Sequence, residues 1–435
     1  MAAPRDLARA QWRDFRCLWA GQSVSLLGSE VTWLALPLTA VVTLHASAAQ
    51  IGLLGAATYA PYLAFGLPGG LVVDRYRHRV VLIIADLGQL AAIGSVPLMA
   101  ALGVLTMPAM LAAAFVAGSF AVFFELAYRA YLPAILPVAA LTAANSRLTA
   151  SESAAEMGGP GLGGLLAQAF GAPYALVLDS VSYLVSAIGL SRIRQREPKP
   201  ERDPQPLRRQ VAEGIAATFR DGYLRAFAGE AASYNLSWQV VQTVLVLYAI
   251  RDLRLSQGIL GLALAVGAAG ALLGALGTVP AARRLGLGTT VIMAAVIGDA
   301  APLLLPFLRP GPFAAPLLGL AFFFRGIGVT GCNVHVNAIR QTITPERMLG
   351  RTNAAYRLLV SGVVPLGSLL GGFLGSTLGV HGTLAVGTVC LLSTSAFLVF
   401  SPVRRVRDLT DCLRFTALKP RTEADADTGA VQSQT

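Results

Sequence analysis

Runs of about 20 mainly apolar residues recur along the whole chain and are separated by short segments rich in glycine, proline or arginine. One such run is what an α-helix needs to cross the hydrocarbon core of a bilayer. Charged residues make up only 13% of the 435 residues, against roughly 25% in soluble domains, so most of this chain is unsuited to face water. The twelve runs are centred near Val31, Tyr62, Ala92, Gly118, Ala155, Ser182, Trp238, Val266, Gly298, Gly326, Pro365 and Leu391. The sequence therefore predicts an all-α integral membrane protein with twelve transmembrane helices.

The 34 lysine and arginine residues are distributed unevenly between the two ends of these helices. Twenty-eight of them fall in the termini and in alternate connections, which all lie on one side of the predicted membrane. By the positive-inside rule, both termini and the central loop are expected in the cytoplasm, with the protein crossing the inner (cytoplasmic) membrane many times. The net charge of +11 is therefore a topology signal, and we expect no nucleic-acid partner.

The cysteines give no sign of a disulfide framework or a metal centre. Cys17, Cys332, Cys390 and Cys412 are far apart and form no CxxC or CxxH spacing, so neither a disulfide scaffold nor a zinc site is predicted. No paired nucleophile and base, metal-ligand spacing or Walker-type loop is recognisable either. We therefore expect no metal, no cofactor and no enzymatic activity.

An internal repeat narrows the fold further. A shift of 208 residues superposes similar residues of the first part of the chain on the second part. The matched pairs are Arg75 with Arg283, Gly118 with Gly326, Pro137 with Pro345, Asn145 with Asn353, and Gly163 with Gly371. One constant offset over this length predicts two pseudo-symmetric six-helix halves with parallel topology, and a substrate site between them near the middle of the membrane.

The repeat and the polar segments divide the chain into four parts. Residues 1–192 form the N-terminal half, 193–221 a cytoplasmic linker, 222–403 the C-terminal half, and 404–435 a cytoplasmic, largely disordered tail. Within the linker, Val211, Ile215 and Phe219 recur every four residues between polar neighbours, which favours a short amphipathic helix on the inner leaflet. The alternative is a simple continuation of the charged, proline-rich linker.

A tight turn joins the second and third predicted helices in the segment GLVVDRYRHR. With Gly70, Asp74, Arg75 and Arg79 it resembles the signature of the major facilitator superfamily, and the resemblance covers roughly residues 12–407. Physically, a carboxylate that pairs with cationic groups of a neighbouring helix end forms a latch that holds one conformation. We assign Asp86, close to this turn, to the same latch; the alternative is charge that merely sets topology.

The fifth predicted helix contains the segment GPGLGG. Its residues Gly159, Pro160, Gly163 and Gly164 resemble the motif associated with the antiporters of that superfamily. Glycines at four-residue spacing let a neighbouring backbone approach closely, and proline loosens the local hydrogen-bond ladder. Close packing alone explains the same pattern, and only the resemblance makes it an antiport signal.

Longer stretches are similar to the macrolide-efflux and enterobactin-exporter branch of the superfamily. These stretches are FFELAYRAYLP at 123–133, ANSRL at 144–148 and RQTITPERMLGRTNAAYR at 340–357. The resemblance implies an exporter rather than a nutrient importer.

Acidic residues within the predicted helices are the candidates for proton coupling, because a charge in the bilayer is costly and is retained mainly for function. Glu30 lies in the middle of the first helix, and Glu152 and Glu156 share one face of the fifth. Like charges on adjacent turns oppose double ionisation, so that one carboxyl retains an exchangeable proton. The alternative for Glu30 is a neutral carboxyl that is tolerated in an aqueous cavity.

The substrate cavity is expected where the first, fourth, seventh and tenth helices meet, as the resemblance implies. Aromatic faces with a few polar groups suit an amphipathic organic molecule. The candidates on these helices are Trp33, Tyr234, Trp238, Arg325, Asn333 and Asn337. The alternative for each is packing or lipid contact.

These observations predict a proton-coupled secondary active transporter. It would export a hydrophobic or amphipathic small molecule, such as an antibiotic, drug or secondary metabolite, from the cytoplasm by alternating access, and so contribute to antibiotic resistance. Its expected partners are this substrate, protons and the lipid bilayer, and we expect a monomer. The alternatives are a siderophore exporter of the same fold and a non-transporting membrane sensor or scaffold.

Overall fold

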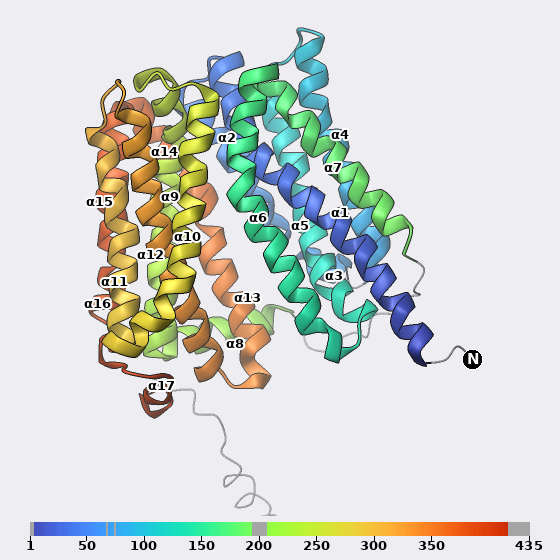
Figure 1. The fold of residues 1–435 in the computed structure, drawn as a ribbon, viewed down its shortest axis with the longest axis vertical. Coiled ribbons are helices and arrows are strands. Elements are labelled where there is room, and N and C mark those ends of the chain that lie inside the picture. Colours follow the sequence, from blue (N-terminus) through green and yellow to red (C-terminus); the bar gives the residue numbers. More distant parts are fainter. Residues whose placement is uncertain (1–3, 67, 74, 194–206, 416–435) are drawn as a thin grey trace, which may run out of the picture.

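A computed structural model describes residues 4–66, 68–73, 75–193 and 207–415 (Figure 1). These residues form helices and no strand. The N-terminal half contains α1 (Pro4–Leu38), η1 (Thr39–Thr43), α2 (Ala48–Phe65), α3 (Pro68–Val73), α4 (His78–Ala101), α5 (Met107–Ile135), α6 (Val138–Phe170) and α7 (Ala172–Ser191).

The C-terminal half follows a connecting helix, α8 (Leu207–Arg220). Its elements are α9 (Gly222–Leu247), η2 (Tyr248–Asp252), α10 (Gln257–Leu285), α11 (Leu287–Ala300), η3 (Ala301–Phe307), α12 (Ala314–Ile343), α13 (Glu346–Gly362), α14 (Val364–Thr377), α15 (Gly379–Thr394), α16 (Ala396–Val399), η4 (Pro402–Arg405) and α17 (Leu409–Phe415).

All twelve predicted membrane spans coincide with helices. Nine stretches within the described parts of the chain are long and apolar enough to cross a membrane. The other three predicted centres, Tyr62, Ala155 and Trp238, lie in α2, α6 and α9. Glu152 and Glu156 lower the mean hydropathy of α6, Arg225 and Glu230 lower that of α9, and α2 is short, with 18 residues. The integral membrane fold predicted from the sequence is therefore confirmed.

The first span of each half ends in the same unusual way. The α-helix passes into one turn of π-helix, η1 in the first half and η2 in the second. A non-glycine residue with positive φ follows, His45 at 51° and Arg254 at 54°. A serine then caps the next helix, since the Ser47 and Ser256 hydroxyls accept hydrogen bonds from backbone N–H groups at the starts of α2 and α10. This shared geometry confirms the internal repeat, with an offset of 209 residues at this connection.

The two halves meet through two equivalent pairs of glycines. A Cβ on Gly52 of α2 would lie 2.7 Å from Cα of Gly372 on α14, and one on Gly164 of α6 would lie 2.9 Å from Cα of Gly261 on α10. Only a residue without a side chain allows backbones to approach this closely. Both contacts lie toward the ends of the spans farthest from α8. In Figure 1, α6 and α10 lie close together near the top and diverge toward the bottom, where α8 lies.

The buried apolar residues show the same asymmetry. One cluster combines both halves, with Leu34 of α1 and Leu245 of α9 among its members. Two other clusters each stay within one half, one around Tyr131 and one around Ile339. We call the end of the bundle that carries α8 and the described ends of the chain the linker side. Both single-half clusters lie toward this side. The halves thus share a continuous core on the opposite side and have separate cores on the linker side.

The connecting helix α8 packs against α13 at the linker side. Glu213 of α8 forms an ion pair with Arg351, and Gly214 lies directly against the Arg351 carbonyl oxygen. Of the segment expected to be largely disordered, residues 404–415 include the helix α17, and its Cys412 is fully buried. Residues 416–435 lie outside the described parts of the chain.

Candidate functional site

A cavity of about 340 Å³ lies between the two halves, among α1, α2, α4, α5, α7 and α9. Its volume falls within the usual range of small-molecule sites, about 300–1,000 Å³. Its lining combines aliphatic residues with a group of aromatic and amide side chains. These are Trp33, Tyr59, Tyr62, Tyr183, Gln89, Gln239 and Gln242.

The lining of this cavity is polar in places but carries no charge. Among the described residues that line it, none is Asp, Glu, Lys, Arg or His. Gln239 uses its amide N–H to bind the Ser368 hydroxyl at 2.9 Å. The carbonyl oxygen of Gln242 is buried and has no hydrogen-bond partner within the described structure. The cavity therefore offers aromatic faces and a few uncharged polar side chains to a molecule that is itself largely apolar.

The three acids predicted for proton coupling lie near one another. Glu30 on α1 is half-buried, and a Cβ at Gly159 would lie 2.2 Å from the Glu30 Cβ, so α6 approaches α1 closely there. Glu152 and Glu156 on α6 are exposed, and both act electrostatically on Glu30. The close approach at Gly159 is what brings these carboxyl groups together, although none of them lines the 340 Å³ cavity.

The other residues of the antiporter-like motif also make close contacts. A Cβ on Gly163 would lie 3.2 Å from Cα of Val31, and Gly164 packs on Gly261 of the other half. The Pro160 carbonyl oxygen also lies against Gly261. One edge of α6 thus packs on α1 while the other packs on α10.

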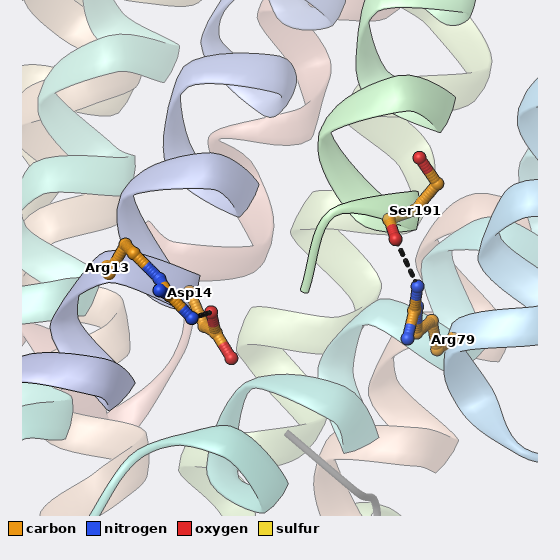
Figure 2. Close-up of polar contacts among 4 residues, drawn as sticks. All are labelled: Arg13, Asp14, Arg79 and Ser191. Atoms are coloured by element: carbon orange, nitrogen blue, oxygen red, sulfur yellow. Dashed lines mark hydrogen bonds and ion pairs between the residues drawn. The ribbon is translucent and has the colours of Figure 1, made fainter. Parts of the chain in front are cut away.

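The latch motif is only partly described, because Asp74 lies outside the described residues. Arg79 donates hydrogen bonds to the backbone carbonyl oxygens of Leu190, at 2.8 Å, and Ser191. Figure 2 shows this guanidinium reaching the end of α7. A cation at the carboxyl end of a helix is stabilised by the helix dipole. Gly70 has open space where a Cβ would stand, and Arg75 is exposed.

Close to this contact, α1 carries a further charged pair. Arg13 lies 3.5 Å from the Asp14 carboxylate (Figure 2). Both this pair and the Arg79 contact lie on the linker side of the N-terminal half.

Asp86, which the sequence assigns to the latch motif, contacts α7. Its side chain is only 1% exposed, and it interacts with Ser186 and Asp179 of α7 rather than with the arginines of the turn. It lies two turns into α4, because α4 begins at His78. The sequence places it near the motif turn, but helix packing turns it toward α7.

The predicted substrate residues divide into three groups. Trp33 lines the cavity. Tyr234, Trp238 and Arg325 form a separate stack in the C-terminal half, with the Arg325 guanidinium 3.5 Å from the Trp238 ring centre and 5.8 Å from that of Tyr234. Asn333 and Asn337 are exposed on α12.

The glutamines and tyrosines of the cavity wall are not among the residues predicted from the sequence. Gln89, Gln239 and Gln242 occur within strongly apolar helices, where an amide group needs a partner or water. A glutamine in an apolar helix is therefore a sequence signal for a polar contact, but it does not say which face of the helix points inward.

Comparisons with known proteins show which family this chain belongs to. The family model described as the Major Facilitator Superfamily matches residues 18–365. The chain belongs to this superfamily. It is therefore a multi-pass membrane transporter and not an enzyme.

Related sequences include proteins named multidrug efflux pump Tap. The one from Mycolicibacterium fortuitum is 26% identical over 391 residues, which cover 88% of this chain and 94% of that protein. The one from Mycobacterium tuberculosis (strain ATCC 25618 / H37Rv) is 26% identical over 428 residues, 95% of each chain.

Solved structures share the fold at low sequence identity. A bacterial homologue of the iron transporter ferroportin, in an inward-facing state, matches with a TM-score of 0.71 and 18% identity over 89% of this chain and 98% of its own. A bacterial homologue of the lysosomal transporter Spinster, inward-facing and unoccupied, matches with a TM-score of 0.66 and 15% identity over 95% and 98%. These matches support the two-half architecture described above.

Proposed function

We propose that this chain is a proton-coupled exporter of hydrophobic or amphipathic small molecules, such as antibiotics, drugs or secondary metabolites. It works as a monomer in the cytoplasmic membrane, with both termini and the linker side in the cytoplasm, as the distribution of arginines favours. The two halves rock about the central cavity and open it alternately to each side.

The uncharged, partly aromatic cavity is the observation that carries this proposal. Its volume of about 340 Å³ suits one organic molecule of drug size. Aromatic rings and a few uncharged polar side chains favour a ligand with flat apolar surface and one or a few polar groups. The similarity to multidrug efflux pumps named Tap supports export of such molecules.

The conformation is consistent with loading from the cytoplasm. The shared apolar core and the two glycine contacts close the opposite side, whereas the linker side has separate cores. A substrate in the cytoplasm or inner leaflet would then enter between the halves.

Proton coupling is assigned to Glu30 with Glu156 and Glu152. The mutual electrostatic influence of these carboxyl groups means that removing one negative charge changes proton binding at the others. Protons enter from outside, bind here, and are released inward as substrate leaves outward.

Ethidium, a planar aromatic dye, provides a test in inverted membrane vesicles energised by an acidic interior. Vesicles that contain the protein should accumulate ethidium, and collapse of the pH gradient should stop accumulation. Accumulation of an iron chelator in place of every aromatic probe would favour a siderophore exporter. Absence of any flux from a correctly folded protein would favour a sensor or scaffold.

A further inference from the structure

Two carboxyl groups are completely enclosed between α4 and α7. Asp86 is 1% exposed and Asp179 0%. Neither oxygen of Asp86 has a partner at hydrogen-bonding geometry within the described structure, and Oδ2 of Asp179 has none either. Oδ1 of Asp179 accepts one hydrogen bond, from the Ser182 hydroxyl at 3.1 Å. Three of the four carboxyl oxygens are therefore buried without a hydrogen bond of good geometry.

The surroundings of this pair are hydroxyl groups rather than cations. Ser186 lies near Asp86, and Thr32 and Tyr183 lie near Asp179. Among the described residues, Tyr183 is the only other titratable side chain that acts on either carboxyl group, and no Lys, Arg or His does so. A pair of ionised carboxylates without a counter-charge is strongly disfavoured in such a place, so at least one of them must carry a proton.

The pair lies directly behind the wall of the central cavity. Ser29, Thr32 and Tyr183 belong to the lining of that cavity, and the Ser29 and Tyr183 hydroxyl groups are 3.4 Å apart. Thr32 and Tyr183 also lie near Asp179. A short series of hydroxyl groups therefore leads from the cavity to Asp179, and Asp86 acts electrostatically on both Asp179 and Tyr183.

The space beside Asp179 is too small for a hydrated ion. A Cβ on Gly28 of α1 would lie 2.6 Å from Oδ1 of Asp179 and 2.4 Å from the Ser182 hydroxyl oxygen. No group of three or more His, Cys, Asp or Glu residues with metal-binding geometry occurs among the described residues. Of the coupling cations, the proton fits this place best.

We propose that Asp86 and Asp179 form a proton-binding pair that exchanges its proton with the central cavity through the Tyr183 and Ser29 hydroxyl groups. The proton moves from cavity water onto a carboxylate oxygen and returns by the same route, so no other reactant is consumed. A substrate that displaces water from the wall changes the affinity of the pair for its proton, and the proton changes the affinity for substrate by the same factor. This inference rests on the proposed function and adds a second coupling site to Glu30.

Infrared spectroscopy of the purified full-length protein tests the pair without any substrate. Wild type should show the C=O stretching band of protonated carboxyl groups at neutral pH, and the double variant D86N/D179N should lose at least one carboxyl group's share of that signal. The matched control is D221N, because Asp221 is a buried acid in another part of the chain, and its carboxyl group accepts hydrogen bonds from two backbone N–H groups. That variant should keep the full band.

Exchange kinetics test the route. After transfer to deuterated water, the band of Tyr183→Phe should shift several-fold more slowly than that of wild type. This variant removes one oxygen atom and also serves if the double variant does not fold. An undiminished band in D86N/D179N, or an unaltered exchange rate in Tyr183→Phe, overturns the inference while leaving proton-driven export through Glu30 intact. Absence of transport in vesicles, with the band assigned to this pair, rejects the proposed function instead.

Discussion

Glu30 is the half-buried carboxyl group to which we assign proton coupling. Glu30→Gln keeps the shape of the side chain and removes its charge, so substrate should still bind while proton-driven accumulation falls by about tenfold or more. Wild-type export should slow as the external pH is raised, because the inward proton gradient shrinks, whereas the variant should show no such dependence. Ethidium uptake into inverted vesicles measures both effects.

The matched control for this substitution is Glu213→Gln. Glu213 lies on the connecting helix α8, far from Glu30, and forms an ion pair with Arg351 of α13. Loss of this ion pair should leave the pH dependence of uptake unchanged. If Glu30→Gln also retained that dependence, proton coupling through Glu30 would be wrong.

Individual residues show what the sequence could and could not predict. Glu30 stands out because a carboxyl group in an apolar run is rare, and its proximity to Gly159 follows from small residues on a helix that packs closely. Asp86 and Asp179 are 93 positions apart, and nothing in either local sequence says that α4 and α7 face one another there. Likewise, Trp238 looks like a free aromatic surface, but the Arg325 guanidinium covers its ring.

At the level of elements, the glycine contact between α6 and α10 fixes how closely the halves approach. A side chain at Gly164 would lie 2.5 Å from the Gln257 carbonyl oxygen and 2.9 Å from Cα of Gly261. Gly164→Val should therefore force the helices apart and cost about 1–3 kcal/mol of stability, as overpacking does. Thermal unfolding of the purified protein, followed by a thiol-reactive dye, measures the change.

Gly158→Val on the same helix is the control, because a Cβ at Gly158 would meet no atom within 4 Å. It introduces the same residue, so both variants share the lower helix propensity of valine. Equal destabilisation by the two substitutions would show that the contact with α10 is not what matters.

Helix boundaries illustrate a second limit of sequence interpretation. The number and order of spans follow from the apolar runs and the repeat, since both depend on composition over many residues. The π-helical turns η1 and η2 depend on local hydrogen-bond geometry at the ends of α1 and α9, for which the sequence has no comparable signal. The break between α13 and α14 in the eleventh span is easier to predict from the sequence, because Pro365 follows it directly.

At the scale of the whole molecule, Arg251 joins the two halves on the side opposite the linker. Its guanidinium donates to the backbone carbonyl oxygens of Ala46, at 3.0 Å, and Val41, at 3.4 Å. Arg251→Gln should weaken this closure and populate the outward-open state more. A cysteine introduced at Thr58 in the cavity wall should then react several-fold faster with a membrane-impermeant thiol reagent added outside. An unchanged rate would show that Arg251 does not stabilise the closed side.

The central claim is that a proton gradient drives an aromatic amphipathic molecule through the cavity between the two halves. The purified protein in liposomes with an imposed pH gradient tests it most directly, with ethidium as the probe and Glu30→Gln as the matched variant. Ethidium should move toward the acidic compartment, and this movement should be abolished by a protonophore and reduced about tenfold or more by Glu30→Gln. Movement that continues at the same rate without a pH gradient, or equally in the variant, would contradict it.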